Sequence, residues 1–309
     1  MNTFVALDRD VRYTRAVPTA TPRIGVSVIT VVYMTGPVLF EHLDSVLTDL
    51  DVDELVVVNN VSTPEDARRL QAIAGREPRM HLIEGHGNVG FAKACNMAVE
   101  AAHGRWLLFL NPDALLRPGT IRALARARAE RTETPVVVGA RVLNPDGTEQ
   151  RGGRRGEVTP VSTFMTLSHL AEKPQFADYE IHREHEPAPS EPVEIPTISG
   201  ACFLMTRADY DAVGGFDTGY FLHVEDVDLC WRVRRQGGVV LYHPGAEVTH
   251  FGSTSVTDPM FVEFWKGRGL ARYFRKRADT LGGKALAWLL GPPIVAAAVA
   301  RAVKLKLRG

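Results

Sequence analysis

Short apolar runs bounded by polar or turn residues recur along the first half of this chain. The run at 106–110 (WLLFL) has five apolar residues in a row, which predicts a strand buried on both faces of a sheet. Runs rich in β-branched residues predict further strands at 26–33, 54–59, 80–83 and 136–139. Apolar residues at helical spacing predict helices over about 37–47, 62–74, 91–103 and 118–131. This alternation is typical of an α/β fold, with a mostly parallel sheet flanked by helices.

The pattern changes after residue 150. Residues 151–196 show no regular periodicity, apart from a short helix predicted at 161–171. An irregular excursion of this length in a compact domain is often a lid or a binding loop. Regular patterns return with a predicted strand at 198–206, a helix near 209, an amphipathic helix that begins at 225, and short strands at 239–242 and 246–249.

Composition indicates one large domain with appendages. The chain has 309 residues, of which 45% are hydrophobic, and this supports a sizeable core. Cys95, Cys202 and Cys230 are far apart and lie in apolar segments, so we expect neither a disulfide framework nor a zinc site, but a reducing, cytoplasmic compartment. Residues 1–23 lack the apolar core of a signal peptide and are expected to form a loose extension. The domain itself is predicted over 24–256, with a second extension over 257–309.

The C-terminal extension differs from the rest in charge. From residue 264 onward it carries eleven Lys/Arg and one acidic residue, although the whole chain has no net charge. A basic helix is predicted over about 259–276, followed by sixteen uncharged residues, 285–300, which Gly291, Pro292 and Pro293 interrupt. This run is shorter than the roughly 20 apolar residues of a membrane span. We expect a helical segment lying on an anionic membrane surface at the cytoplasmic face. A packed or dimer-forming helical hairpin is the alternative, and nucleic-acid binding is not expected.

Acidic and metal-binding side chains occur at the ends of predicted elements. Asp113 follows the 106–110 strand after Asn111 and Pro112, at the edge where open α/β sheets bind ligands. His250 follows the last predicted strand, and carboxylate, imidazole and phosphate ligands together suit Mg²⁺ or Mn²⁺. A cluster of three acids begins the 225 helix, where one could act as a general base: Glu225, Asp226 and Asp228. A turn-capping Asp113, a merely charged helical turn and a structural His250 are the alternatives.

Seven segments in order carry a family resemblance. They are Tyr33, VVVNNVS at 56–62, NVGFAKACN at 88–96, LLFLNPD at 107–113, SGACFLM at 199–205, GGFDTGYFLHVEDVDLCWR at 214–232 and HFGSTS at 250–255. Together they resemble the motif set of GT-A fold, family 2 inverting glycosyltransferases, and in particular the bacterial rhamnosyltransferase-like branch. The resemblance covers about residues 24–256.

The resemblance implies a nucleotide-diphospho-sugar donor, linked to dTDP, UDP or GDP, and an inverting single displacement. It implies Asp226 as the general base, with Glu225 as its rival, and Asp113 and His250 as ligands of Mg²⁺ or Mn²⁺. It places these residues at the donor: Val31, Tyr33, Asn59, Asn88, Gly90, Lys93, Asn111, Gly200 and Ala201. Asn59 and Asn111 depart from the family pattern, because acidic residues often stand at both positions.

We therefore expect an inverting glycosyltransferase that moves a sugar, such as rhamnose or another deoxyhexose, to a glycan or lipid-linked acceptor in cell-surface polysaccharide synthesis. A sugar nucleotidyltransferase would share the α/β core, but residues 34–42 lack the glycine-rich, Arg- and Lys-containing loop of that class. The third hypothesis is a membrane-tethered, non-catalytic nucleotide-sugar-binding module, motivated by Asn59 and Asn111.

Overall fold

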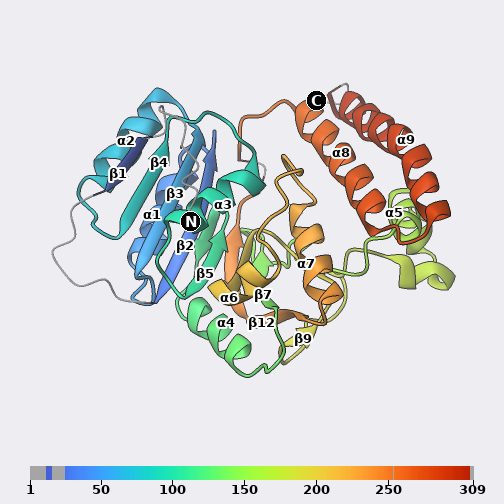
Figure 1. Cartoon of the computed structure of the whole chain (residues 1–309), viewed down its shortest axis with the longest axis horizontal. Coiled ribbons are helices and arrows are strands. Elements are labelled where there is room, and N and C mark those ends of the chain that lie inside the picture. The colour runs from blue at the N-terminus through green and yellow to red at the C-terminus, as the bar shows by residue number, and fades with distance from the viewer. Residues whose placement is uncertain (1–11, 16–24, 253, 307–309) are drawn as a thin grey trace, which may run out of the picture.

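The computed structural model describes residues 12–15, 25–252 and 254–306, and its centre is a ten-stranded mixed sheet (Figure 1). Along the sheet the order is β1-β4-β3-β2-β5-β11-β7-β12-β6, and β9 pairs with β12 beside this path. The strands are β1 (Arg12–Arg15), β2 (Val26–Tyr33), β3 (Glu54–Val61), β4 (Met80–Glu84), β5 (Trp106–Leu110), β6 (Ala114–Leu116), β7 (Val136–Leu143), β9 (Val193–Glu194), β11 (Cys202–Thr206) and β12 (Val239–His250). A separate two-stranded sheet pairs β8 (Arg154–Arg155) with β10 (Thr197–Ile198).

Helices cover both faces of the large sheet. One core cluster packs α1, α2 and α4 on one face, and a second packs α3, α6 and α7 on the other. Strand residues alternate between these clusters: Leu108 and Leu110 belong to the first, Leu107 and Phe109 to the second. The helices are α1 (Val38–Leu47), α2 (Pro64–Ala74), α3 (Phe91–Ala101), α4 (Thr120–Ala129), α5 (Pro160–Leu167), α6 (Arg207–Ala212), α7 (Glu225–Arg235), α8 (Pro259–Arg277) and α9 (Leu281–Lys306), with 3-10 turns η1 (Leu170–Glu172) and η2 (Pro174–Tyr179).

The predicted α/β fold with flanking helices is confirmed, but the sheet is mixed rather than mostly parallel. β4, β3, β2 and β5 run parallel, as the helix-strand alternation predicted. β11 runs antiparallel to both β5 and β7, because the 151–196 excursion returns the chain to the sheet at the end where β5 stops. β6 and β9 also run antiparallel to β12, and β12 is one bulged strand where two short strands were predicted.

Four strands were not predicted from the sequence: β1, β6, β8 and β9. β1 lies within the 1–23 extension and pairs antiparallel with the edge strand β4. Residues 1–11 and 16–24, the remainder of that segment, lie outside the described residues.

The C-terminal segment forms a helical hairpin of α8 and α9, which lie side by side (Figure 1). The prediction that Gly291, Pro292 and Pro293 interrupt the second helix was wrong, because α9 continues through them. The prolines free the carbonyl groups of Trp288 and Leu289, which belong to strongly exposed residues and can bond water instead. α9 is therefore long and apolar enough over Leu281–Val303 to cross a membrane by length and composition, and 17% of its most apolar window is buried. The prediction of a run too short for a span is corrected accordingly.

Candidate active site

The end of β5 and the end of β12 bring two predicted metal ligands together. Asp113 is buried, and its Oδ1 lies 3.0 Å from His250 Nε2. Its Oδ2 accepts a hydrogen bond of 3.0 Å from Thr254, and its backbone oxygen accepts one from the Phe251 N–H. Burial raises the pKa of Asp113, but the hydrogen bonds of His250 and Thr254 and the charge of His250 outweigh burial and lower it overall. The carboxylate is thus ionised and placed beside an imidazole.

Gln150 fixes the tautomer of His250. The Gln150 Nε2 donates to His250 O at 3.0 Å and to Asn144 Oδ1 at 3.1 Å, so Oε1 is the atom that faces His250 Nδ1 at 2.6 Å. Nδ1 therefore carries the proton. In the neutral ring Nε2 then presents a lone pair to the Asp113 carboxylate, and two acceptors at 3.0 Å repel unless a proton or a cation lies between them. This donor set fits a divalent metal ion.

The turn before β11 links these ligands to the predicted base. Asn111 N donates to Ala201 O at 2.9 Å, and Gly200 N donates to Asp226 Oδ2 at 3.1 Å. Asn111 Nδ2 also lies 3.3 Å from His250 Nε2. The predicted residues Asn111, Gly200, Ala201 and Asp226 therefore belong to one continuous site.

The two candidate bases have opposite electrostatic environments. Burial raises the pKa of Asp226, but the charge and hydrogen bond of Arg155 and the N–H groups of Val227 and Gly200 lower it overall. Burial and the neighbouring Asp226 raise the pKa of Glu225, whose Oε2 is buried without a hydrogen-bond partner among the described residues. Near neutral pH Asp226 is ionised and Glu225 tends to keep its proton, so of the two only Asp226 is in the form that could accept one. Asp228, the third acid, is fully buried and bonded by Tyr220, Arg232 and Lys276, which indicates a structural role.

The predicted donor residues lie near the carboxyl ends of β2 and β3. Asn59 is buried, and its Oδ1 has no hydrogen-bond partner among the described residues; the same holds for Asn60 Oδ1 and Thr35 Oγ1. Such orphaned atoms at one edge are what a polar ligand would satisfy. Val31 packs in the core, Tyr33 accepts from Ser255 through its carbonyl oxygen, and Lys93 is exposed.

The loop before α3 holds a fixed shape. Asn88 Oδ1 accepts from Gly90 N at 3.0 Å, and Asn60 Nδ2 donates to Gly90 O at 3.2 Å. Gly90 has a φ of 84°, and a Cβ there would lie 2.7 Å from the carbonyl oxygen of Phe221. Glycine is therefore required at this position.

Four site residues were missed from the sequence: Arg155, Gln150, Asn60 and Thr254. Asn60 stands beside the predicted Asn59 in VVVNNVS, so the motif itself offered that signal. Arg155 pairs with Asp226 across 71 residues of sequence, because β8 and β10 bring the excursion against α7. No local sequence pattern predicts a contact between residues so far apart in the chain. Ser253, part of the HFGSTS segment, lies outside the described residues.

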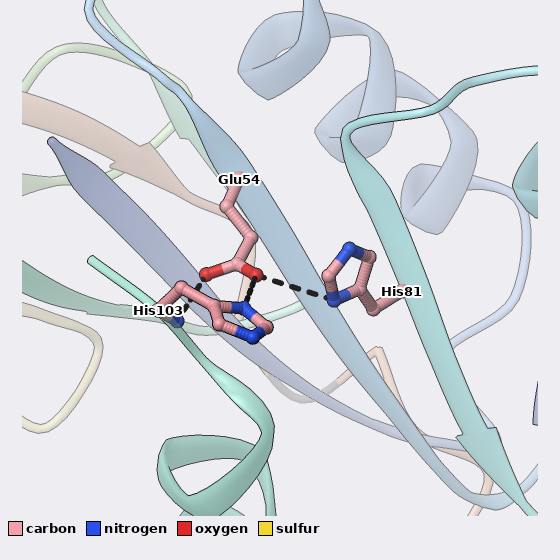
Figure 2. A group of neighbouring side chains, drawn as sticks. All are labelled: Glu54, His81 and His103. Atoms are coloured by element: carbon pink, nitrogen blue, oxygen red, sulfur yellow. Dashed lines mark hydrogen bonds and ion pairs between the residues drawn. The ribbon is translucent and has the colours of Figure 1, made fainter. Parts of the chain in front are cut away.

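A second group of metal-competent side chains lies at the opposite edge of the sheet (Figure 2). Glu54, His81 and His103 stand near the amino ends of β3, β4 and β5, and their ligand atoms lie within 4.8 Å of one another. Glu54 already accepts from Ser27 Oγ, His103 N (2.7 Å) and His103 Nδ1 (2.8 Å), and its Oε1 lies 3.2 Å from His81 Nδ1. The group could hold a metal, yet its carboxylate is satisfied without one.

Glu54→Gln is expected to lower the free energy of unfolding by about 2 kcal/mol at pH 7, because buried donors lose a charged acceptor. Burial raises the pKa of Glu54, but its hydrogen bonds and the charge of His81 lower it overall. The stabilisation is therefore present above the unfolded pKa and lost as the pH falls below about 4. Urea denaturation at pH 7 and in acid measures this, with exposed Glu100→Gln as the control. If the difference in unfolding free energy between Glu54→Gln and the unaltered protein grew in acid, the stabilising role of the Glu54 carboxylate would be contradicted.

Comparison with known proteins decides the family. Residues 27–214 match the family described as Glycosyl transferase family 2. The chain belongs to that family. It is 30% identical over 251 residues to an N-acetylglucosaminyl-diphospho-decaprenol L-rhamnosyltransferase of Mycobacterium tuberculosis strain H37Rv, covering 75% of this chain and 78% of that protein. It is 23% identical to rhamnosyltransferase WbbL of Escherichia coli K12, over 68% of this chain and 79% of that one.

Solved structures agree on the fold. A mannosyltransferase from Pyrobaculum calidifontis, solved with GDP-Man and Mn²⁺, is 20% identical with a TM-score of 0.56, over 94% of this chain and 78% of that chain. GalNAc-T7 with UDP, GalNAc and Mn²⁺ is 16% identical with a TM-score of 0.62, over 88% of this chain and 51% of that longer chain. The expected GT-A fold and glycosyltransferase class are thus confirmed, and the nucleotidyltransferase alternative finds no support.

Proposed function

We propose that this glycosyltransferase moves a deoxyhexose, L-rhamnose, from a nucleotide diphosphate to a lipid-linked acceptor with inversion at the sugar carbon. The observation that carries the proposal is the joining of Asp113, His250 and Asp226 through the Asn111 and Gly200–Ala201 backbone contacts. The rhamnosyl donor and a polyprenyl-diphosphate acceptor are supported by the name of the mycobacterial relative.

In this mechanism one set of residues binds the donor, and another acts on the acceptor. Asn59, Asn60 and the loop at Asn88 and Gly90 bind the nucleotide, and Asp113 and His250 would hold Mg²⁺ or Mn²⁺. Such an ion would supply positive charge to offset the charge that develops on the diphosphate leaving group. Asp226 accepts the proton of the acceptor hydroxyl as that oxygen attacks the opposite face of the sugar. Its Oδ1 accepts only the Val227 N–H among the described residues, which leaves a lone pair for this purpose.

A thermal-shift screen tests the donor assignment. A ligand that binds only the native state raises the melting temperature by mass action. We expect dTDP-rhamnose with Mn²⁺ or Mg²⁺ to raise it, and the same donor with EDTA to raise it much less. UDP- and GDP-sugars are tested in parallel, and the donor that raises the melting temperature most identifies the nucleotide class. If no nucleotide sugar changes the melting temperature with metal present, the donor site is refuted.

We further propose that the α8–α9 hairpin attaches the enzyme to the cytoplasmic face of an anionic membrane. Trp288 and Leu289 are 66% and 73% exposed on α9, and the basic residues of α8 lie on the neighbouring helix. Apolar surface flanked by Lys and Arg is what interfacial binding requires.

Replacing both Trp288 and Leu289 with Ser is expected to weaken binding to anionic phosphatidylglycerol vesicles at least about tenfold, because each side chain contributes roughly 1.5–3 kcal/mol when buried in lipid. Both are exposed, so the fold should tolerate the change. Leu50→Ser, at a residue 87% exposed elsewhere on the surface, is the matched control. Vesicle sedimentation measures the effect, and equal binding of all three proteins would exclude the membrane role.

A further inference from the structure

The two oxygens of the Glu54 carboxylate have different partners. Oε2 accepts hydrogen bonds from Ser27 Oγ and from the backbone N–H of His103, the latter at 2.7 Å. Ser27 Oγ in turn accepts from Gly104 N at 2.8 Å, and a Cβ at Gly104 would lie 2.5 Å from that oxygen, so this close approach requires glycine. These contacts fix the orientation of the carboxylate and leave Oε1 to a second set of partners.

Oε1 of Glu54 faces two imidazole nitrogens (Figure 2). His103 Nδ1 lies 2.8 Å from it and His81 Nδ1 lies 3.2 Å from it, and all three atoms lie within 4.8 Å of one another. A tetrahedral Zn²⁺ with nitrogen and oxygen ligands at about 2.0–2.2 Å holds those ligand atoms about 3.3 Å apart. Both separations from Oε1 are within about half an ångström of that value, so the three atoms already outline one face of a zinc coordination tetrahedron.

The three ligands come from separate elements at the amino edge of the sheet. Glu54 begins β3, His81 lies on β4 and His103 precedes β5, with β2 between β3 and β5. The side chains of Glu54 and His81 are 10% and 13% exposed, whereas that of His103 is 60% exposed. An ion could therefore enter beside His103 and keep a water molecule as its fourth ligand.

The ligand chemistry and the place of this group differ from those of the donor edge. Two imidazoles with one carboxylate favour Zn²⁺, whereas Mg²⁺ prefers oxygen ligands throughout. Glu54 and Asn59 stand five residues apart on β3, which separates them by roughly 17 Å along the strand. An ion held by Glu54 is thus distinct from one held by Asp113 and His250, and remote from the sugar donor.

We propose that Glu54, His81 and His103 form a structural binding site for Zn²⁺. Coordination requires an Nδ1 lone pair from each ring, so the proton that His103 Nδ1 donates to Oε1 in the metal-free protein moves to Nε2 through solvent. The ion would join the amino end of β3 to the segment that follows α3. The opposite ends of these two elements carry the proposed nucleotide-binding residues Asn59 and Gly90, and the ion would stabilise that half of the sheet without contacting the donor.

Titration calorimetry with Zn²⁺, without nucleotide, tests the site. The metal-free Asp113→Asn protein is used, so that the donor edge does not compete for the ion, and we expect it to bind one Zn²⁺. Groups that only support a metal ligand are worth about 10–100-fold in affinity, so adding His103→Asn, which removes a ligand, is expected to weaken binding at least about 100-fold. His169→Asn is the matched control in the same background, because His169 is exposed and its Nδ1 lies 2.7 Å from a single carboxylate, that of Glu172.

Thermal unfolding provides the second readout. Zn²⁺ should raise the melting temperature of Asp113→Asn and of its His169→Asn derivative, but not that of its His103→Asn derivative, and Mg²⁺ should raise none of them. The proposal is overturned if His103→Asn binds Zn²⁺ as tightly as its parent. It is also overturned if Asp113→Asn alone binds no Zn²⁺, since the three residues are then a hydrogen-bonded group only. Donor binding is measured separately, on the unaltered protein with Mn²⁺, so this inference and the proposed function can fail independently.

Discussion

Asp226→Asn is expected to lower kcat for sugar transfer about 10³-fold while donor affinity stays nearly unchanged. A general base contributes roughly 10²–10⁴ in rate, and an amide cannot accept the proton of the acceptor hydroxyl. The Asn side chain keeps the size of Asp, and with its oxygen in the place of Oδ2 it still accepts from Gly200 N and Arg155 and loses only the bond from Val227 N, so the site should retain its shape. Initial rates of transfer, together with the donor-induced thermal shift, measure the two properties separately.

Glu225→Gln is the matched control for this prediction. Glu225 is buried, and its raised pKa means that a neutral Gln imitates the protonated side chain. We expect its rate to stay within a few-fold of the unaltered enzyme. An active Asp226→Asn enzyme combined with an inactive Glu225→Gln enzyme would transfer the role of base to Glu225.

Asp113→Asn is the second substitution with a large expected effect. The change removes the negative charge that faces His250 Nε2 and keeps the size of the side chain. Because metal stabilisation of a leaving group supplies several kcal/mol, we expect activity to fall at least about 100-fold and the metal-dependent part of the donor thermal shift to disappear.

Titration of Mn²⁺ at fixed donor concentration checks this second prediction. Asp146→Asn provides the control, since Asp146 is an exposed turn residue whose carboxylate bonds only Thr148 among the described residues. An unchanged metal requirement in Asp113→Asn would show that the ion is held elsewhere. The Glu54, His81 and His103 group would then be the next candidate to test.

Local sequence patterns were sufficient to predict that Asp113 and His250 lie at or just after the ends of strands. The apolar run at 106–110 forms the buried strand β5, and the residues after it, Asn111 to Asp113, lie at the sheet edge that was expected. Strand ends depend on neighbouring residues in the chain, and for that reason Asp113 and His250 could be predicted separately. The pairing of β6 with β12 brings the two residues together, with 3.0 Å between Asp113 Oδ1 and His250 Nε2. That pairing could not be predicted from local sequence patterns.

The excursion and the C-terminal helices were harder to predict, because long-range packing decides both. Arg155 sits in a run of Arg and Gly that predicts only irregular structure, yet β8–β10 pairing directs it to Asp226. Pro292 and Pro293 normally end a helix, but here α9 continues through them and packs on α8 at Gly267. The antiparallel direction of β11 was hard to predict for the same reason, because it follows from the path of residues 151–196.

Direct detection of the product tests most directly whether this chain transfers a sugar from a nucleotide diphosphate to a lipid-linked acceptor. The enzyme would be incubated with dTDP-L-rhamnose, N-acetylglucosaminyl-diphospho-polyprenol and Mn²⁺ or Mg²⁺, and the lipid fraction analysed by mass spectrometry and by NMR of the new glycosidic bond. We predict one added deoxyhexose with inverted anomeric configuration, formed only with metal and not by Asp226→Asn. Donor binding without any product from dTDP-, UDP- or GDP-sugars would contradict the account and favour a non-catalytic binding module.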